Sequence, residues 1–132
     1  MRCTTALRPW TGWSTPDETL DRNNPVAVGE CGLDYFRNFS PRDAQLVAFR
    51  RQLQIAKETG LPVFLHQRDA HDDFIDVLEP FLPALSRAVA HCFTGEHESL
   101  REYVELGLYI GITGWICDER RGKHLHDIVS VV

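Results

Sequence analysis

The centre of the chain reads TGLPVFLH over residues 59–66, where the end of a predicted helix is followed directly by a short apolar strand. Thr59-Gly60 is typical of a helix end, because glycine readily takes the left-handed conformation found there. The expected strand, residues 61–65, is apolar on both sides, as in strands that are covered on both faces. The chain thus passes from a helix into a buried strand, and the ionisable His66 comes next.

The same unit occurs twice more along the chain. Val26-Ala27-Val28 is an apolar run closed by Gly29-Glu30, and Ala88-Val89-Ala90 is followed by His91. A fourth apolar strand is expected over residues 108–113. These four segments have the length and composition of short buried strands.

Amphipathic helices are expected between the strands. The first begins at Ser40-Pro41, with serine as N-cap and proline at the first helical position. Asp69 with Asp72 opens the second helix, Thr94 the third and Asp118 the last. The expected apolar faces are Leu46, Phe49, Leu53 and Ala56, then Ala70, Phe74, Val77 and Leu78, then Leu100, Tyr103 and Val104. Alternation of such helices with buried strands predicts an α/β fold with a parallel sheet.

Composition limits the class of protein. The chain has 132 residues, a formal net charge of −5 and 43% hydrophobic residues, which indicates one globular domain or a piece of one. The acidic balance excludes nucleic-acid binding through net charge, although an enzyme can gather positive charge at a metal site. No apolar run reaches the roughly 20 residues of a membrane helix, and the first residues lack a secretory signal. The four cysteines are far apart, so we expect reduced thiols and a soluble, cytoplasmic protein that does not contact membranes.

Ionisable side chains follow three of the expected strands at equivalent places. Glu30, His66 and His91 should therefore meet at the carboxyl edge of the parallel sheet, where α/β enzymes place their chemistry. Imidazole nitrogen and carboxylate oxygen suit Zn, Mn or Fe, or Mg where carboxylates dominate. Either histidine alone is more typical of a hydrogen-bonded loop partner, and the glutamate alone of a helix cap. Their recurrence in three consecutive units favours a metal site.

Other polar residues are weaker candidates. Arg68, two residues past His66, is a candidate for binding phosphate. Cys31 and Cys92 should point away from the site, because side chains alternate along a strand. The remaining histidines are expected to face solvent: His71, His97, His124 and His126.

Four ordered motifs at these positions resemble a known family. They are GECGLD at residues 29–34, LHQRDAH at 65–71, HCFTG at 91–95 and GITGW at 111–115. These are similar to the successive signatures of the TatD family of metal-dependent hydrolases, over about Val26 to Leu125. Residues 117–122 (CDERRG) resemble the family's namesake more than its distant relatives.

The resemblance implies a TIM-type (β/α) barrel with a DNase activity that uses a divalent metal ion, namely Mg, Mn or Zn. It assigns Glu30, His66 and His91 as metal ligands. The implied reaction is hydrolysis of DNA phosphodiester bonds, with removal of nucleotides from 3′ ends, so that DNA is the expected partner. Metal ions would hold the scissile phosphate and activate water.

The chain also departs from the family pattern. It lacks the His-x-His strand that opens the family's barrel, and it stops before the final Asp, so no catalytic base is assigned. A complete barrel needs at least about 200 residues, so we expect a partial TIM-type barrel of about four strand–helix units out of the usual eight. Residues 1–25 are expected to be irregular and without a reliable family match, and residues 26–132 to be the central part of the barrel. Such a chain would be a fragment or the product of a damaged reading frame, with open sheet edges that invite self-association.

Two alternatives to the DNase interpretation stay open. The same fold and ligands serve metal-dependent hydrolases of small amides or lactones. A truncated remnant could instead keep the motifs and yet be inactive, because its site is incomplete.

Overall fold

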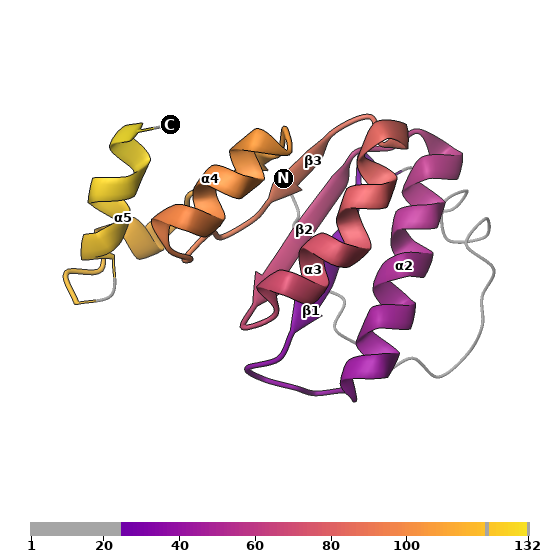
Figure 1. Cartoon of the computed structure of the whole chain (residues 1–132), viewed down its shortest axis with the longest axis horizontal. Helices are drawn as coiled ribbons and strands as arrows, with labels where there is room; N and C mark the ends of the chain where they lie inside the picture. The colour runs from indigo at the N-terminus through magenta and orange to yellow at the C-terminus, as the bar shows by residue number, and fades with distance from the viewer. Residues whose placement is uncertain (1–24, 121, 132) are drawn as a thin grey trace.

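Four parallel strands alternate with helices in the computed structural model of the chain, which describes residues 25–120 and 122–131 (Figure 1). The strands are β1 (Val28–Asp34), β2 (Val63–Arg68), β3 (Ala88–Ala90) and β4 (Tyr109–Ile110), in the order β1-β2-β3-β4. The helices are α2 (Arg42–Thr59), α3 (His71–Leu78), α4 (His97–Glu105) and α5 (Lys123–Ile128), with 3-10 turns at Glu79–Ala84, Gly114–Cys117 and Val129–Val131. The α/β class is confirmed. The irregular segment expected over residues 1–25 lies, apart from Pro25, outside the described residues.

The main core lies between the sheet and the helices of one face. Figure 1 shows α2 and α3 side by side over the same face of β1 and β2. Phe49 of α2 and Phe74 of α3 are fully buried there, and their rings stack at 5.3 Å between centroids. Leu33 and Leu65 meet them from the sheet with 1% and 0% exposure. In the part of the chain that the structure describes, no helix covers the opposite face of the sheet.

The helices follow the sequence pattern closely along their lengths, but their predicted starts and one apolar position differ. α2 ends at Gly60, whose φ of 70° confirms the predicted left-handed end. At its start, however, Pro41 and not Ser40 is the N-cap residue, without a side-chain cap, so the predicted serine cap is wrong. α3 begins at His71, because Asp69 has a φ of 53° and lies outside the helix. α4 begins at His97 and α5 at Lys123, so the predicted starts at Thr94 and Asp118 are also wrong. Val104, predicted on the apolar face of α4, is 42% exposed. None of the described helices is long and apolar enough to cross a membrane.

The strand boundaries differ more from the prediction. β1 runs from Val28 to Asp34 and β2 from Val63 to Arg68, so both extend past the polar residues that were expected to follow them. β4 is shorter than the expected strand over residues 108–113. Gly29 is the physical reason at β1, since a glycine inside a strand accommodates a bulge as readily as it ends the strand. Glu30 and His66 therefore lie within strands, and His91 alone of the three directly follows one.

Gly32 allows β1 to lie close against β2. It pairs with His66 and has a φ of 144°, a conformation that side chains rarely adopt. A Cβ atom at this position would clash with the backbone oxygen of His66. Since that neighbour is backbone, it cannot rotate away. The pairing of β1 with the strand that carries His66 therefore requires glycine here.

We expect Gly32→Ala to lower the free energy of unfolding by at least about 2 kcal/mol, because the added methyl clashes with backbone and the φ becomes strained. Urea denaturation followed by circular dichroism measures this difference. Gly114→Ala is the matched control, since nothing lies within 4 Å of its added Cβ, and its effect should stay within about 0.5 kcal/mol. Equal stability of the two variants would contradict the close approach at Gly32.

Candidate metal centre at the carboxyl edge of the sheet

Glu30, His66 and His91 come together in the structure, as the sequence predicts. One carboxylate oxygen of Glu30, Oε1, lies 2.9 Å from Nδ1 of His91 and 3.5 Å from Nδ1 of His66. Their side chains are 40%, 34% and 27% exposed for Glu30, His91 and His66 respectively, so solvent and solutes reach all three. Two imidazoles from neighbouring strands thus converge on a single carboxylate oxygen.

A bulge in β1 brings Glu30 to this place. Gly29 pairs with Phe64 and Cys31 with Leu65, so Glu30 is an extra residue without a partner in β2. In a regular strand Glu30 would pair with Leu65 and face the helices, because side chains alternate between the two faces. The bulge instead turns its carboxylate to the face that carries His66. Bulges of this kind often re-aim a side chain next to a functional site.

Asp34 joins the cluster, and the sequence reasoning did not single it out. Its Oδ2 lies 3.3 Å from Nε2 of His66, on the side of the ring away from Glu30. Burial raises the pKa of the Asp34 carboxyl. A hydrogen bond from the backbone N–H of Arg37 and the contact with His66 outweigh that effect and hold the pKa below its usual value. In β1, Gly32 pairs with His66 and Asp34 with Arg68. A prediction that continued the first strand past Gly29 would therefore have placed Asp34 on the same face of the sheet as the site.

The donor set suits a divalent metal ion, although the side chains contact one another. Within residues 25–120 and 122–131, no three His, Cys, Asp or Glu side chains surround a common point as they would around an ion. The hydrogen bond from His91 and the contact with His66 occupy the Glu30 oxygen instead. The groups that meet there, one carboxylate oxygen and two imidazole nitrogens, are nevertheless the donors that Zn and Mn take in proteins. The residues present therefore fit such an ion chemically.

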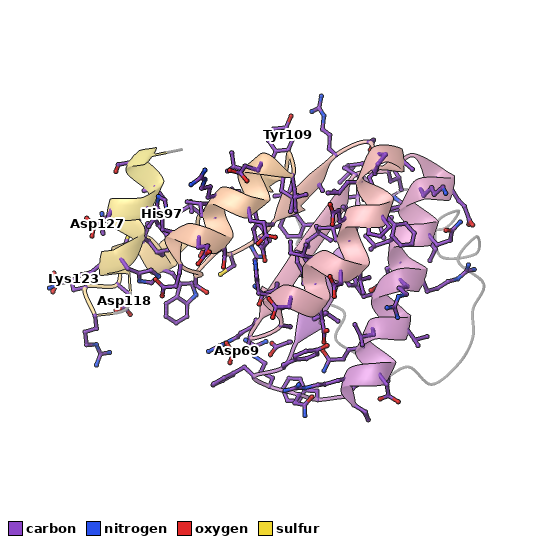
Figure 2. The ribbon with its side chains drawn as sticks, viewed as in Figure 1. Asp69, His97, Tyr109, Asp118, Lys123 and Asp127 are labelled. Carbon is purple, nitrogen blue, oxygen red and sulfur yellow. The ribbon has the colours of Figure 1, made fainter. Side chains whose placement is uncertain are left out.

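Arg68 lies at the same edge, at the carboxyl end of β2. Its guanidinium carbon is 3.8 Å from the centroid of the Phe36 ring. Among the described residues no carboxylate lies within ion-pair distance of Arg68. Figure 2 labels the next residue, Asp69, at the lower end of the sheet, while Tyr109 marks the opposite end. The charge of Arg68 is thus available beside the cluster.

Contrary to the prediction, His71 does not face solvent. Its Nε2 lies 2.7 Å from Oε2 of Glu102, and its ring stacks on Tyr103 at 5.4 Å between centroids. Burial raises the pKa of the Tyr103 hydroxyl to about 12, against a hydrogen bond from Gln67 and with support from the Glu102 charge. His71 therefore joins α3 to α4. The predictions for His97 and His126 are confirmed, since both are exposed, whereas His124 is half-buried and contacts the backbone oxygen of Thr94.

Cys31 points away from the cluster, as predicted. It is 3% exposed, and its Sγ lies 3.8 Å from the backbone oxygen of Phe64. Burial, with a smaller contribution from the Glu30 charge, raises the pKa of this thiol to about 12. Because the thiolate is the nucleophile, Cys31 has no such role near neutral pH.

Fold and site together define a class: a partial (β/α) barrel with a carboxylate–imidazole cluster at the carboxyl edge of its parallel strands. The sequence profile of the family described as TatD related DNase matches residues 13–132. The chain belongs to this family. Hydrolases of the TatD family are metal-dependent.

Relatives and solved structures agree with this assignment. A protein of Pantoea sp. (strain At-9b) named 3'-5' ssDNA/RNA exonuclease TatD is 58% identical over 107 residues, which cover 81% of this chain and 41% of the relative. One of the same name from Rahnella sp. (strain Y9602) is 57% identical over 109 residues, covering 83% and 41%. The crystal structure of YJJV, a TatD homologue from Escherichia coli K12, matches with a TM-score of 0.76 and 35% identity, over 87% of this chain and 44% of that one. The chain thus spans about two fifths of the length of these curated relatives.

Alkylation should distinguish the buried thiol from an exposed one. At pH 8 we expect iodoacetamide to modify Cys31 at least about 100-fold more slowly than the exposed Cys117, because Cys31 is buried and less than about one in a thousand of its thiols is ionised. The rate at Cys31 should stay low until the pH approaches 12. Peptide mapping by mass spectrometry measures both rates. Comparable rates in the folded protein would show that Cys31 is not buried as described.

Proposed function

We propose that this chain supplies three ligands, Glu30, His66 and His91, to the divalent metal site of a hydrolase that removes nucleotides from the 3′ end of single-stranded DNA. The observation that carries the proposal is the position of Glu30 Oε1 between the Nδ1 atoms of both histidines. The names of the Pantoea and Rahnella relatives support the substrate and the direction. Those names include RNA, which we propose as a second substrate.

Each residue of the cluster has a distinct task in this proposal. Glu30 presents a negative oxygen to the ion from the β1 bulge, and His91 presents a nitrogen from the end of β3. Asp34 accepts a hydrogen bond from Nε2–H of His66, which keeps the proton on that nitrogen and leaves the lone pair of Nδ1 on the side of Glu30. A bound Mg, Mn or Zn ion would polarise the scissile phosphate and lower the pKa of a coordinated water.

Arg68 binds the phosphate backbone of the substrate in this proposal. Its guanidinium has no carboxylate partner among the described residues and lies at the edge where the cluster is exposed. Arginine suits this task, because its planar fork donates two parallel hydrogen bonds to a phosphate. A protein with a net charge of −5 needs such a local cation to hold an anionic strand.

A chimera tests the proposed function directly. Residues of this chain replace the matching segment of the Pantoea relative, so that the remaining three fifths of the sequence come from the relative. Degradation of 3′-labelled single-stranded DNA with Mg²⁺ or Mn²⁺ would support the proposal. A folded chimera that hydrolyses amides or lactones but no phosphodiester, or that hydrolyses nothing, would contradict it.

His91→Ala should weaken metal binding by at least about 10-fold, since even the loss of residues that only support a ligand costs about 10–100-fold. Titration of the 132-residue chain with Mn²⁺ by calorimetry measures the affinity, and the same substitution in the chimera should abolish most nuclease activity. His126→Ala, which removes an exposed histidine of α5, is the matched control. Unchanged Mn²⁺ affinity in a folded His91→Ala variant would remove His91 from the site.

We further propose that the 132 residues, expressed alone, self-associate and are poor nucleases. Within the described residues β1 and β4 each have a neighbouring strand on one side only, and unpaired strand edges invite pairing with another chain. Light scattering should therefore report an oligomer. Calorimetric titration of the same chain should show weak metal binding. A monodisperse monomer that degrades single-stranded DNA with Mg²⁺, and loses this activity on His66→Ala, would contradict the prediction.

A further inference from the structure

The loop between β1 and α2 exposes two large aromatic side chains beside the candidate metal centre. Phe36 is 60% exposed and Phe39 is 82% exposed, although burial of a phenylalanine is worth about 1.5–3 kcal/mol. The loop begins directly after Asp34, whose carboxylate contacts His66. Exposed rings at this place are therefore next to the position proposed for the scissile bond.

Arg68 covers the Phe36 ring at 3.8 Å, and Arg42 covers the neighbouring Tyr35 ring at 4.3 Å. Neither guanidinium is among the ion pairs of the described residues, whereas Arg37 pairs with Asp34 at 3.7 Å. Tyr35 itself is held in place, because its hydroxyl donates a hydrogen bond of 2.6 Å to Asp73. Of these two cation–aromatic pairs, Phe36 with Arg68 is thus the one whose ring is not held by a hydrogen bond to another described residue.

The loop that carries Phe36 is well anchored. The side chain of Gln45 accepts a hydrogen bond from the backbone N–H of Asp34 at 2.9 Å and donates one to the backbone oxygen of Ser40 at 2.8 Å. The backbone N–H of Tyr35 donates to the backbone oxygen of Arg68 at 2.9 Å. Both sides of the Phe36–Arg68 pair are therefore fixed relative to each other, and a ligand that stacks there loses little entropy to loop ordering.

Aromatic faces combined with arginine suit single-stranded nucleic acid. Unpaired bases stack on phenylalanine rings and on guanidinium planes, and the guanidinium also donates hydrogen bonds to phosphate. A duplex keeps its bases inside the stack and cannot offer them to Phe36. The net charge of −5 means that binding must come from such local contacts and not from the general field.

We propose that Phe36 and Arg68 form a stacking platform for one unpaired base of a single-stranded nucleic acid, with the adjacent phosphate held by Arg68. The inference rests on the proposed function and goes beyond it, because it assigns a base-binding residue and explains a preference for single strands. Stacking does not depend on the sugar, so the platform accepts both DNA and RNA. It would hold the strand next to Glu30, His66 and His91.

Metal-free binding tests the platform apart from hydrolysis. Fluorescence anisotropy of labelled dT and rU oligonucleotides, with the full 132-residue chain in EDTA, measures affinity. Phe36→Ala should weaken binding by about 5–100-fold, the range for loss of one base–aromatic stack, and Phe36→Trp should restore it with quenching of the new tryptophan. Arg68→Ala should weaken binding and reduce the slope of log affinity against log salt by about 0.7, the value for one phosphate of a single strand.

Tyr109→Ala is the matched control, because Tyr109 is 57% exposed but lies at the opposite end of the sheet (Figure 2). It should leave oligonucleotide affinity unchanged. An oligonucleotide without bases should bind the unaltered chain as weakly as a normal oligonucleotide binds Phe36→Ala. Its affinity for the Phe36→Ala variant should be no lower than its affinity for the unaltered chain. This second comparison shows that the lost contact is to a base.

Three outcomes would overturn the platform: unchanged affinity in Phe36→Ala, equal binding of oligonucleotides with and without bases, or a change only in self-association, which would assign Phe36 to a contact between proteins. If Phe36→Ala leaves oligonucleotide affinity unchanged, while the chain binds Mn²⁺ normally and His91→Ala loses that binding, only the platform is contradicted. The proposed function then stands. Loss of the metal site with retained base stacking would contradict the proposed function and leave the platform intact.

Discussion

One residue of β1 without a partner in β2 determines what the carboxyl edge of the sheet can do. If Glu30 paired with Leu65, its carboxylate would face Phe49 and Phe74 in the apolar core, where an unpaired charge costs several kcal/mol. The bulge moves it to the other face and lets Cys31 pair with Leu65 in its place. Core packing and the candidate metal centre therefore both depend on the same register shift.

The shift also sets the orientation of the later residues of β1. After Cys31 the strand alternates again, so that Leu33 enters the core while Gly32 and Asp34 stay on the face that carries His66 and Arg68. The backbone of His66 leaves no room for a side chain at residue 32, which is glycine. Of the paired residues Gly32 and His66, only the histidine therefore presents a side chain on this face of the sheet. Asp34 then reaches Nε2 of His66 from one position further along the face. A single strand thus places a carboxylate on each side of the same imidazole.

Much of this arrangement could be predicted from sequence. The helix-end glycine and the three-and-four spacing of α2 are local signals, and they predicted the helix now seen over Arg42–Thr59 together with its buried face at Phe49, Leu53 and Ala56. The recurrence of ionisable residues after apolar runs selected Glu30, His66 and His91, which the fold does bring together. The predicted end of the third strand at Ala90 is confirmed. The predicted ends of the first two strands were wrong, because Gly29 and the polar residues after Leu65 resemble a strand's end when their partners across the sheet are unknown.

The residues that sequence reasoning missed depend on contacts between distant segments. His71 has the pattern of a surface helix residue until α4 brings Glu102 and Tyr103 against it, with Glu102 31 residues away along the chain. No local spacing encodes that contact.

Charge at this edge is divided between two kinds of contact, and the division follows from the fold. The carboxylates of Glu30 and Asp34 are held by imidazoles, so their negative charge is directed at the place where a cation would bind. The arginines Arg42 and Arg68 lie over aromatic rings instead of carboxylates, which leaves their charge free to attract an anion. Gln45 ties the two groups together, because it lies in α2 and bonds to Asp34 at the end of β1. Packing of α2 on the sheet therefore fixes the loop after β1, where the Phe36 ring lies under Arg68, next to the strand that carries Glu30 and Asp34.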